Sequence, residues 1–388
     1  MKNTIYTIVL LFICLLVSCS PDRKQNKYEL TELYVNLYDK NIDFYELSDE
    51  VQEFEFIRLE TTDNCLIGHI EKILLENDVY YILDNIYQAI YCFSSSGKHI
   101  ATLNRFGPGP DEYLEINDFV VENENIWICD NRTQRVVCYD KNQNRIDWID
   151  LKKNDFWVEH MVYQDGYIYM VNNWIGIKPK NYQILIYDLK NKKTSLEKPF
   201  SPLQHVIYRG MNNQIALIDS LCMVTFSYCD TIFQIRNETI VPKYKYRFSE
   251  RMIDVPLVIS DNPPIEDPNI IKGLMNIYQT PNSIILKFSD NGKIRMAIFD
   301  KENTSGKIYS GFKIADLGNF HLIDLHFLPN SLISIFDSVD FKMYFAYLID
   351  ENFKRQHDKE KIKEEVSKIK DDDNPLLFRF ILKNNSKL

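Results

Sequence analysis

The chain has 388 residues, of which 45% are hydrophobic and 26% charged, so it can form one large domain or two ordinary ones around sizeable cores. Its formal net charge of −10 argues against a nucleic-acid partner, because phosphate binding needs a basic surface. The 24 Tyr and 23 Phe favour strands over helices, and the small numbers of Gly (12) and Pro (14) argue against low-complexity disorder.

Residues 1–18 have the pattern of a signal peptide. Lys2 supplies a positive start, and residues 5–17 form an apolar run that is short for a membrane span. The run leads into the letters LVSC, ending at Cys19, which resemble the lipobox of bacterial lipoproteins. We therefore predict that Cys19 is lipidated and becomes the new N-terminus. The alternatives are an ordinary signal peptide with an incidental Cys, or a poor transmembrane helix.

A polar segment follows the predicted lipidation site. Residues 20–27 contain Pro21 and read as a tether, and we extend this lipidated tether over residues 19–41. The acidic cluster that surface-exported lipoproteins often carry after the Cys is reduced here to Asp22. The sequence thus predicts an outer-membrane lipoprotein of the cell envelope, held to the membrane through its lipid, and leaves the periplasmic or surface face open.

An internal repeat begins after residue 78. Segments 79–93 and 125–139 align at a constant offset of 46 residues. The matching positions are Asp84 and Asp130, Asn85 and Asn131, Gln88 and Gln134, and Cys92 and Cys138. Each unit reads as strand, polar turn, strand and further strand, and a period near 46 with about four strands is typical of a β-propeller blade.

Fainter copies of the unit continue along the chain. They lie at residues 184–188, 231–235, 295–300 and 376–380. Residues 54–59 look like a strand left over before the first repeat, and we expect them to pair with residues 376–380 and close the ring. Lys- and Glu-rich residues 351–370 predict a short charged helix inserted in the last blade. The predicted fold is therefore all-β, a six-bladed β-propeller over residues 42–388.

A glycine-rich element lies between the first two units. Its residues are Gly107, Pro108, Gly109, Pro110, Asp111, Glu112 and Tyr113. They resemble the G-x-G-P-G-E-[FY] element between blades of NHL-type propellers, lengthened by about one residue at Asp111. Gly tolerates positive φ and Pro stiffens the turn, so we interpret the element as structural, with ligand contact as the alternative. A phosphate cradle is excluded because no Lys-Ser/Thr pair follows.

The wider pattern resembles the six-bladed β-propeller lipoproteins of Bacteroides-type bacteria, an NHL-like or TolB-like group. The resemblance covers nearly all of the mature chain. It is carried by residues 56–61, 67–68, 82–84, 107–113, 229–233 and 373–376. It implies the propeller architecture and export, and it supplies no catalytic residue.

Other candidate residues are scattered. His69, His160 and His321 fall in runs expected to form innermost strands, so they are candidates to line the channel, but their offsets from the following turns differ, which favours three unrelated histidines. Six Cys follow Cys19 without a CxxC pair, which favours free buried thiols over disulfides or zinc ligands. Three Asp-Ser/Thr-hydrophobic triplets resemble O-glycosylation sites of exported proteins, with acceptors at Ser220, Thr231 and Ser338.

Two functions remain open at this stage. The first is a non-catalytic binding or scaffold protein whose ligand is a glycan, a peptide or a partner lipoprotein, since nucleophile-elbow, zinc-protease, EF-hand and P-loop motifs do not occur. The alternative is a lactonase-like hydrolase with one divalent cation in the channel, by analogy of fold. Carboxylate and amide oxygens converging in the channel would favour the enzyme. The sequence predicts no catalytic residue, resident cofactor or metal.

Replacing Cys19 with Ala is expected to release or mislocalise a folded protein, because the variant lacks its lipid. Fractionation of carbonate-washed membranes measures the effect. A Cys14→Ala variant, which changes a Cys inside the signal peptide, should remain with the membranes. Retention of the Cys19→Ala variant in washed membranes would show that the lipid-anchor prediction is wrong.

Overall fold

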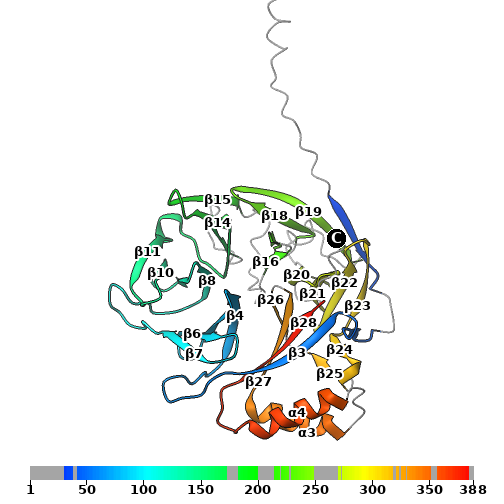
Figure 1. Cartoon of the computed structure of the whole chain (residues 1–388). Coiled ribbons are helices and arrows are strands. Elements are labelled where there is room, and N and C mark those ends of the chain that lie inside the picture. The colour runs from blue at the N-terminus through cyan, green and yellow to red at the C-terminus, as the bar shows by residue number, and fades with distance from the viewer. Residues whose placement is uncertain are drawn as a thin grey trace, which may run out of the picture.

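The computed structural model describes residues 30–37, 42–172, 182–199, 214–248 and 270–383, apart from gaps at 219, 227–228, 272, 318–319, 323–324, 329 and 351–355. Within these residues the protein is mostly β-strand, and its sheets are arranged around a common centre (Figure 1). The predicted signal peptide and Cys19 lie outside the described residues. No helix in the described part of the chain is long and apolar enough to cross a membrane.

Three antiparallel sheets of four strands follow one another. The first contains β4 (Ile70–Glu76), β5 (Val79–Asp84), β6 (Ala89–Ser94) and β7 (His99–Leu103). The second contains β8 (Asp118–Glu122), β9 (Asn125–Asp130), β10 (Arg135–Tyr139) and β11 (Arg145–Asp150), and η1 (Lys152–Asn154) follows it. The third contains β12 (His160–Gln164), β13 (Tyr167–Val171), β14 (Tyr182–Asp188) and β15 (Lys193–Pro199).

The first hairpin of each of these sheets is a tight turn. Both turn residues have positive φ, the backbone that a two-residue hairpin requires and that Asn, Asp and Gly tolerate best. The turns are Asn77-Asp78, Asn123-Glu124 and Asp165-Gly166. The recurring turn explains why the predicted units begin at regular spacing.

The next eight strands belong to one nine-stranded sheet. Its first half contains β16 (Ile215–Ile218), β17 (Leu221–Val224), β18 (Thr231–Arg236) and β19 (Thr239–Phe248). Its second half contains β20 (Leu274–Gln279), β21 (Ser283–Asp290), β22 (Lys293–Asp300) and β23 (Ser305–Tyr309). The ninth strand, β1 (Thr31–Val35), runs parallel to β19 and to β23 and joins the two halves.

Strand β1 corrects two expectations. The tether was predicted to extend to residue 41, and each group of four strands was predicted to form its own sheet. Instead, Leu33 and Val35 are 2% and 3% exposed and pack in the core between the two halves. The backbone of β1 pairs on both sides. This short segment therefore forms hydrogen-bond ladders with two strands and also buries apolar side chains.

The last four-stranded sheet joins the two ends of the chain. It contains β26 (Leu325–Leu328), β27 (Ser331–Phe336), β28 (Leu376–Leu382) and β3 (Val51–Arg58), in that order. Strand β3 pairs antiparallel with β28, with Phe56 opposite Phe378, and this confirms the predicted pairing of residues 54–59 with 376–380. The rings of Phe56 and Phe378 stack with centroids 4.4 Å apart.

Two helices, rather than the single charged helix predicted, lie between β27 and β28. They are α3 (Ser338–Asp350) and α4 (Gln356–Lys368), and α4 coincides with the prediction. Helix α3 buries Phe341 and Phe345, whose rings lie 5.2 Å and 6.0 Å from Phe56. A small sheet of β2 (Tyr45–Glu46), β24 (Phe312–Ile314) and β25 (Phe320–Leu322) stands nearby, with η2 (Ala315–Leu317) after β24 (Figure 1).

Strands in the middle of the sheets are buried on both faces. In β5, Tyr81 and Leu83 pack in the cluster shared with the second sheet, whereas Tyr80 and Ile82 pack in the cluster shared with β28. Each sheet therefore packs against two neighbours. Innermost strands also touch in succession, since β26 contacts β4, β4 contacts β8, β8 contacts β12, β12 contacts β16 and β16 contacts β20. This is a propeller-like arrangement.

Loss of the closing strand is expected to destabilise the whole ring. Deleting residues 54–59 removes Phe54 and Ile57, which are 6% and 3% exposed, and uncovers the edge of β28. We expect the melting temperature, followed by circular dichroism, to fall by roughly ten degrees or more. Ile57→Ala is the milder variant and should cost about 2–4 kcal/mol of unfolding free energy. Deleting residues 21–27 is the control, and equal melting of all three proteins would contradict the closure.

Candidate functional site

The repeated aspartates hold turns. Asp84 and Asp130 are fully buried at the ends of β5 and β9. The Asp84 carboxylate accepts hydrogen bonds from the backbone N–H of Gly68 (2.6 Å) and Ile86 (2.8 Å), and Asp130 accepts equivalent bonds from Leu114 (2.9 Å) and Thr133 (3.0 Å). Each carboxylate thus joins the turn after its strand to the segment that leads into the sheet. These hydrogen bonds explain why Asp recurs at the same place in the two repeated segments.

The Gly-Pro-Gly element folds around the side chain of Glu112. The Glu112 carboxylate accepts a bond from the Gly109 N–H at 2.7 Å, and a Cβ on Gly107 would lie 2.1 Å from the same carboxylate. Tyr113 is fully buried and donates its hydroxyl to the carbonyl of Gln88 at 2.7 Å. The two glycines are needed for close approach, and these contacts, together with Pro108 in the same loop, give the element a structural role.

Lys72 connects three sheets near the centre of the ring. Its ammonium donates to the Asp118 carboxylate at 2.6 Å and to the carbonyls of Phe119 and Met161 at 2.8 Å and 3.3 Å. Lys72 lies on β4, Asp118 begins β8 and Met161 lies on β12. An ammonium has three N–H donors, so all of them are used. We name Lys72, Asp118 and His160 the central cluster.

The central cluster holds a buried charge. Asp118 is 2% exposed, and burial alone would raise the pKa of its carboxyl. The Lys72 charge and the nearby His160 outweigh burial, so the pKa of Asp118 lies below its ordinary value. Its second oxygen accepts the Met161 N–H at 2.6 Å. The carboxylate is therefore ionised at neutral pH and fully occupied by internal partners.

The three candidate histidines have different surroundings. His160 begins β12, with Nδ1 3.8 Å from an Asp118 oxygen and 28% of its side chain exposed. His69 precedes β4 and is largely exposed, 4.0 Å from Glu71. His321 was expected on an innermost strand, but it lies in β25 of the small sheet and stacks on Phe44 at 4.2 Å. Only His160 faces a buried polar partner near the centre.

The candidate glycosylation residues also differ. Ser220 is exposed in a hairpin turn, whereas Thr231 is half-buried and donates its hydroxyl to Asp230 at 2.8 Å. Ser338 is 3% exposed and donates to the carbonyls of Asp373 and Asn374, which leaves no room for a sugar in the folded protein. Ser220 is therefore the best-presented of the three acceptors.

The described cysteines are free thiols. Five are buried and Cys229 is half-buried. Burial raises the pKa of the Cys65 thiol to about 11 and that of Cys92 to about 12. Thiols with such pKa values are protonated at neutral pH and act as small apolar groups.

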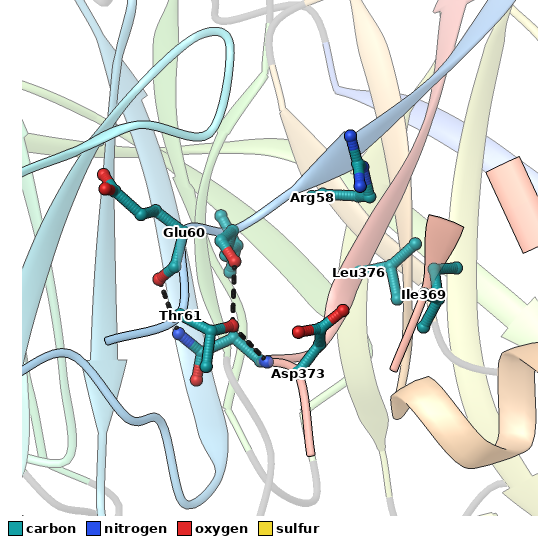
Figure 2. Close-up of a pocket in the computed structure, with 8 residues that line it drawn as sticks. Arg58, Glu60, Thr61, Ile369, Asp373 and Leu376 are labelled. Carbon is teal, nitrogen blue, oxygen red and sulfur yellow. Dashed lines mark hydrogen bonds between the residues drawn. The ribbon is translucent and has the colours of Figure 1, made fainter. Parts of the chain in front are cut away.

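A hollow lies at the seam where β3 and β28 close the ring. Its volume is about 240 Å³. It is lined by Arg58, Leu59, Glu60, Thr61, Ile369, Asp373, Asn374 and Leu376. Figure 2 shows the Asp373 carboxylate directed into it, with Leu376 and Ile369 beyond. Sequence reasoning noted residues 373–376 only through family resemblance and missed this hollow, because its walls come from opposite ends of the chain.

Asn374 fastens the seam. Its N–H donates to Thr61 Oγ1, and its side-chain amide donates to the carbonyls of Glu60 and Cys65, each at 2.8 Å. Its side-chain oxygen accepts the Ile67 N–H at 2.9 Å. Asn374 is 4% exposed, so this fully bonded side chain locks the entry to β28 onto the segment after β3.

The central cluster does not fit the cation of the hydrolase alternative. In the part of the chain that the structure covers, no three His, Cys, Asp or Glu side chains gather as metal ligands. Lys72 already supplies the positive charge beside Asp118. A divalent cation at that carboxylate would have to displace an ammonium with three hydrogen bonds.

The fold and its internally bonded centre define a propeller-like, mostly β protein. The chain belongs to the family described as Domain of unknown function (DUF4934), whose sequence model matches residues 35–380. No curated protein matches the chain by sequence.

Several solved structures are similar to this chain. A protein from Bacteroides fragilis, named as a candidate exported protein, has a TM-score of 0.67 at 17% identity and covers 91% of this chain and 100% of its own. A member of the DUF4221 family from Bacteroides vulgatus has a TM-score of 0.49 at 10% identity, covering 87% and 99%. Virginiamycin B lyase from Staphylococcus aureus has a TM-score of 0.40 at 13% identity, covering 72% and 80%.

Asp118→Asn is expected to lower the unfolding free energy by about 2–4 kcal/mol at neutral pH, because it leaves the Lys72 ammonium without its counter-charge. The folded-state pKa of Asp118 lies below the unfolded-state value of about 3.9. The ion pair therefore stabilises above that value and is lost as the pH falls through the folded-state pKa. Urea titrations at neutral and acidic pH should show a smaller acid loss in the variant. Asp78→Asn, in an exposed turn, is the control, and identical acid losses would contradict the linkage.

Proposed function

We propose that this chain is an exported, lipid-anchored six-bladed β-propeller that acts as a non-catalytic binding or scaffold protein. The blade count takes each half of the nine-stranded sheet as one blade, bridged by β1, beside the four separate four-stranded sheets. The lipobox-like sequence ending at Cys19 supports the anchor. The fold relative from Bacteroides fragilis, named as a candidate exported protein, supports export of this chain.

The observation that carries the binding role is the state of the central cluster. Lys72 uses all three donors on groups of the protein, and both oxygens of Asp118 accept internal bonds. Lys72 and Asp118 are committed to holding sheets together, which argues against a role for either as an acid, a base or a cation ligand. Binding would then take place on a face of the ring, where turns and helices present free side chains.

Thermal-shift screening of glycan and peptide libraries tests this role. A variant that begins at Ser20 serves as the soluble protein. One ligand class is expected to raise the melting temperature in proportion to the logarithm of its concentration, because binding to the folded state stabilises it. Turnover of a screened substrate in the absence of any stable ligand would overturn the proposal in favour of an enzyme.

A further inference from the structure

Large apolar side chains are exposed on the elements that meet at the seam. They are Leu66 (45% exposed), Ile86 (62%), Tyr87 (54%), Val339 (44%) and Met343 (62%). Monomeric proteins do not often gather large apolar groups on adjoining surface segments. Val339 and Met343 are four residues apart, so they lie on one face of α3. We name these five residues the seam patch.

Contacts of neighbouring residues link the chain segments that carry the seam patch. Gly68 packs against Ile86 and Tyr87, since a Cβ placed there would lie 3.2 Å from each. Asn374 bonds to Cys65 and Ile67, the two residues that flank Leu66. Ser338, beside Val339, bonds in turn to the Asn374 carbonyl at 3.1 Å. The segments that carry the patch residues are therefore joined through Asn374 at the closing seam.

The surroundings of the seam patch are strongly acidic. Segments 60–71, 85–88, 337–343 and 370–373 contain eight Asp or Glu and two Lys, an excess of six out of the ten net negative charges of the whole chain. One of the two lysines, Lys342, is paired with Asp371. Apolar side chains on segments rich in carboxylates complement a partner that is apolar on one face and basic at its borders.

The seam hollow provides a place for a basic side chain. Asp373 directs its carboxylate into the hollow (Figure 2), and Leu59, Ile369 and Leu376 supply an apolar wall. Lys and Arg combine an apolar stem with a charged end, which matches such a wall and carboxylate. Arg58 is the one cationic side chain among the described residues that line the hollow. Its Nε lies 3.5 Å from a carboxylate oxygen of Glu365, which balances its charge.

From the seam patch, its acidic border and the hollow, we propose that this surface binds a basic amphipathic segment of another protein, with a Lys or Arg side chain entering the hollow. The proposal rests on the binding role proposed above and assigns it a surface and a partner chemistry. It favours a polypeptide over a glycan, because four of the five patch residues are aliphatic or Met and stacking sugars needs aromatic faces.

The probe for this surface is a 14-residue peptide of Leu and Lys patterned as an amphipathic helix. Fluorescence anisotropy with the variant that begins at Ser20 measures its Kd. Ile86→Ser together with Met343→Ser is expected to weaken binding about tenfold or more, since both are central apolar contacts. Ile146→Ser together with Ile294→Ser changes two isoleucines that are 52% and 46% exposed on β11 and β22, and it should leave the Kd unchanged.

Charge is tested with a second pair of variants. Asp373→Asn keeps the size of the side chain and should weaken binding severalfold at low salt, whereas Asp78→Asn, in the β4–β5 turn, should not. The same peptide with Glu in place of Lys should not bind. Three outcomes would overturn the proposal. The Glu peptide binds as tightly as the Lys peptide, the control variants weaken binding as much as the seam variants, or the Lys peptide does not bind. If a glycan binds and the seam variants leave it unaffected, this surface assignment fails while the binding role stands.

Discussion

The pairing of β3 with β28 is the constraint on which the rest of this structure depends. The middle strands of each sheet bury both faces, so a sheet without a neighbour on one side would expose a layer of Tyr, Ile and Leu. A row of such sheets is stable only when its ends meet. Here the first sheet packs against Leu377 of β28, and β28 is held by Phe54, Phe56 and Ile57 from the N-terminal side. Asn374 adds four hydrogen bonds at the same junction.

Much of the fold could be predicted from sequence because its determinants are local. Asp84 and Asp130 each bond to backbone groups 16 residues earlier and two or three residues later, so the same letters recur at the same spacing. The closing strand was also predictable, since residues 54–59 are a strand pattern without a partner in the repeats.

The features that the sequence did not predict were missed for physical reasons too. Helix α3 was missed because its buried Phe341 and Phe345 stand in an aromatic-rich run that resembles a strand. Strand β1 was read as tether because only Leu33 and Val35 mark it as buried. The central cluster draws Lys72, Asp118 and His160 from three different sheets, and no spacing in a single sequence reveals such a meeting. The seam hollow was hidden for the same reason, since Thr61 and Asp373 lie at opposite ends of the chain.

Strand β1 has a mechanical consequence. Any pull on the N-terminus, such as the proposed lipid anchor would transmit, reaches β1 before it reaches β3. Strand β1 is held by ladders to β19 and β23, so tension is divided between two strands, neither of which pairs with the closing sheet. The junction of β3 with β28 is thereby shielded from traction. A ring whose stability depends on one closing strand is thus fastened to its surroundings by a different one.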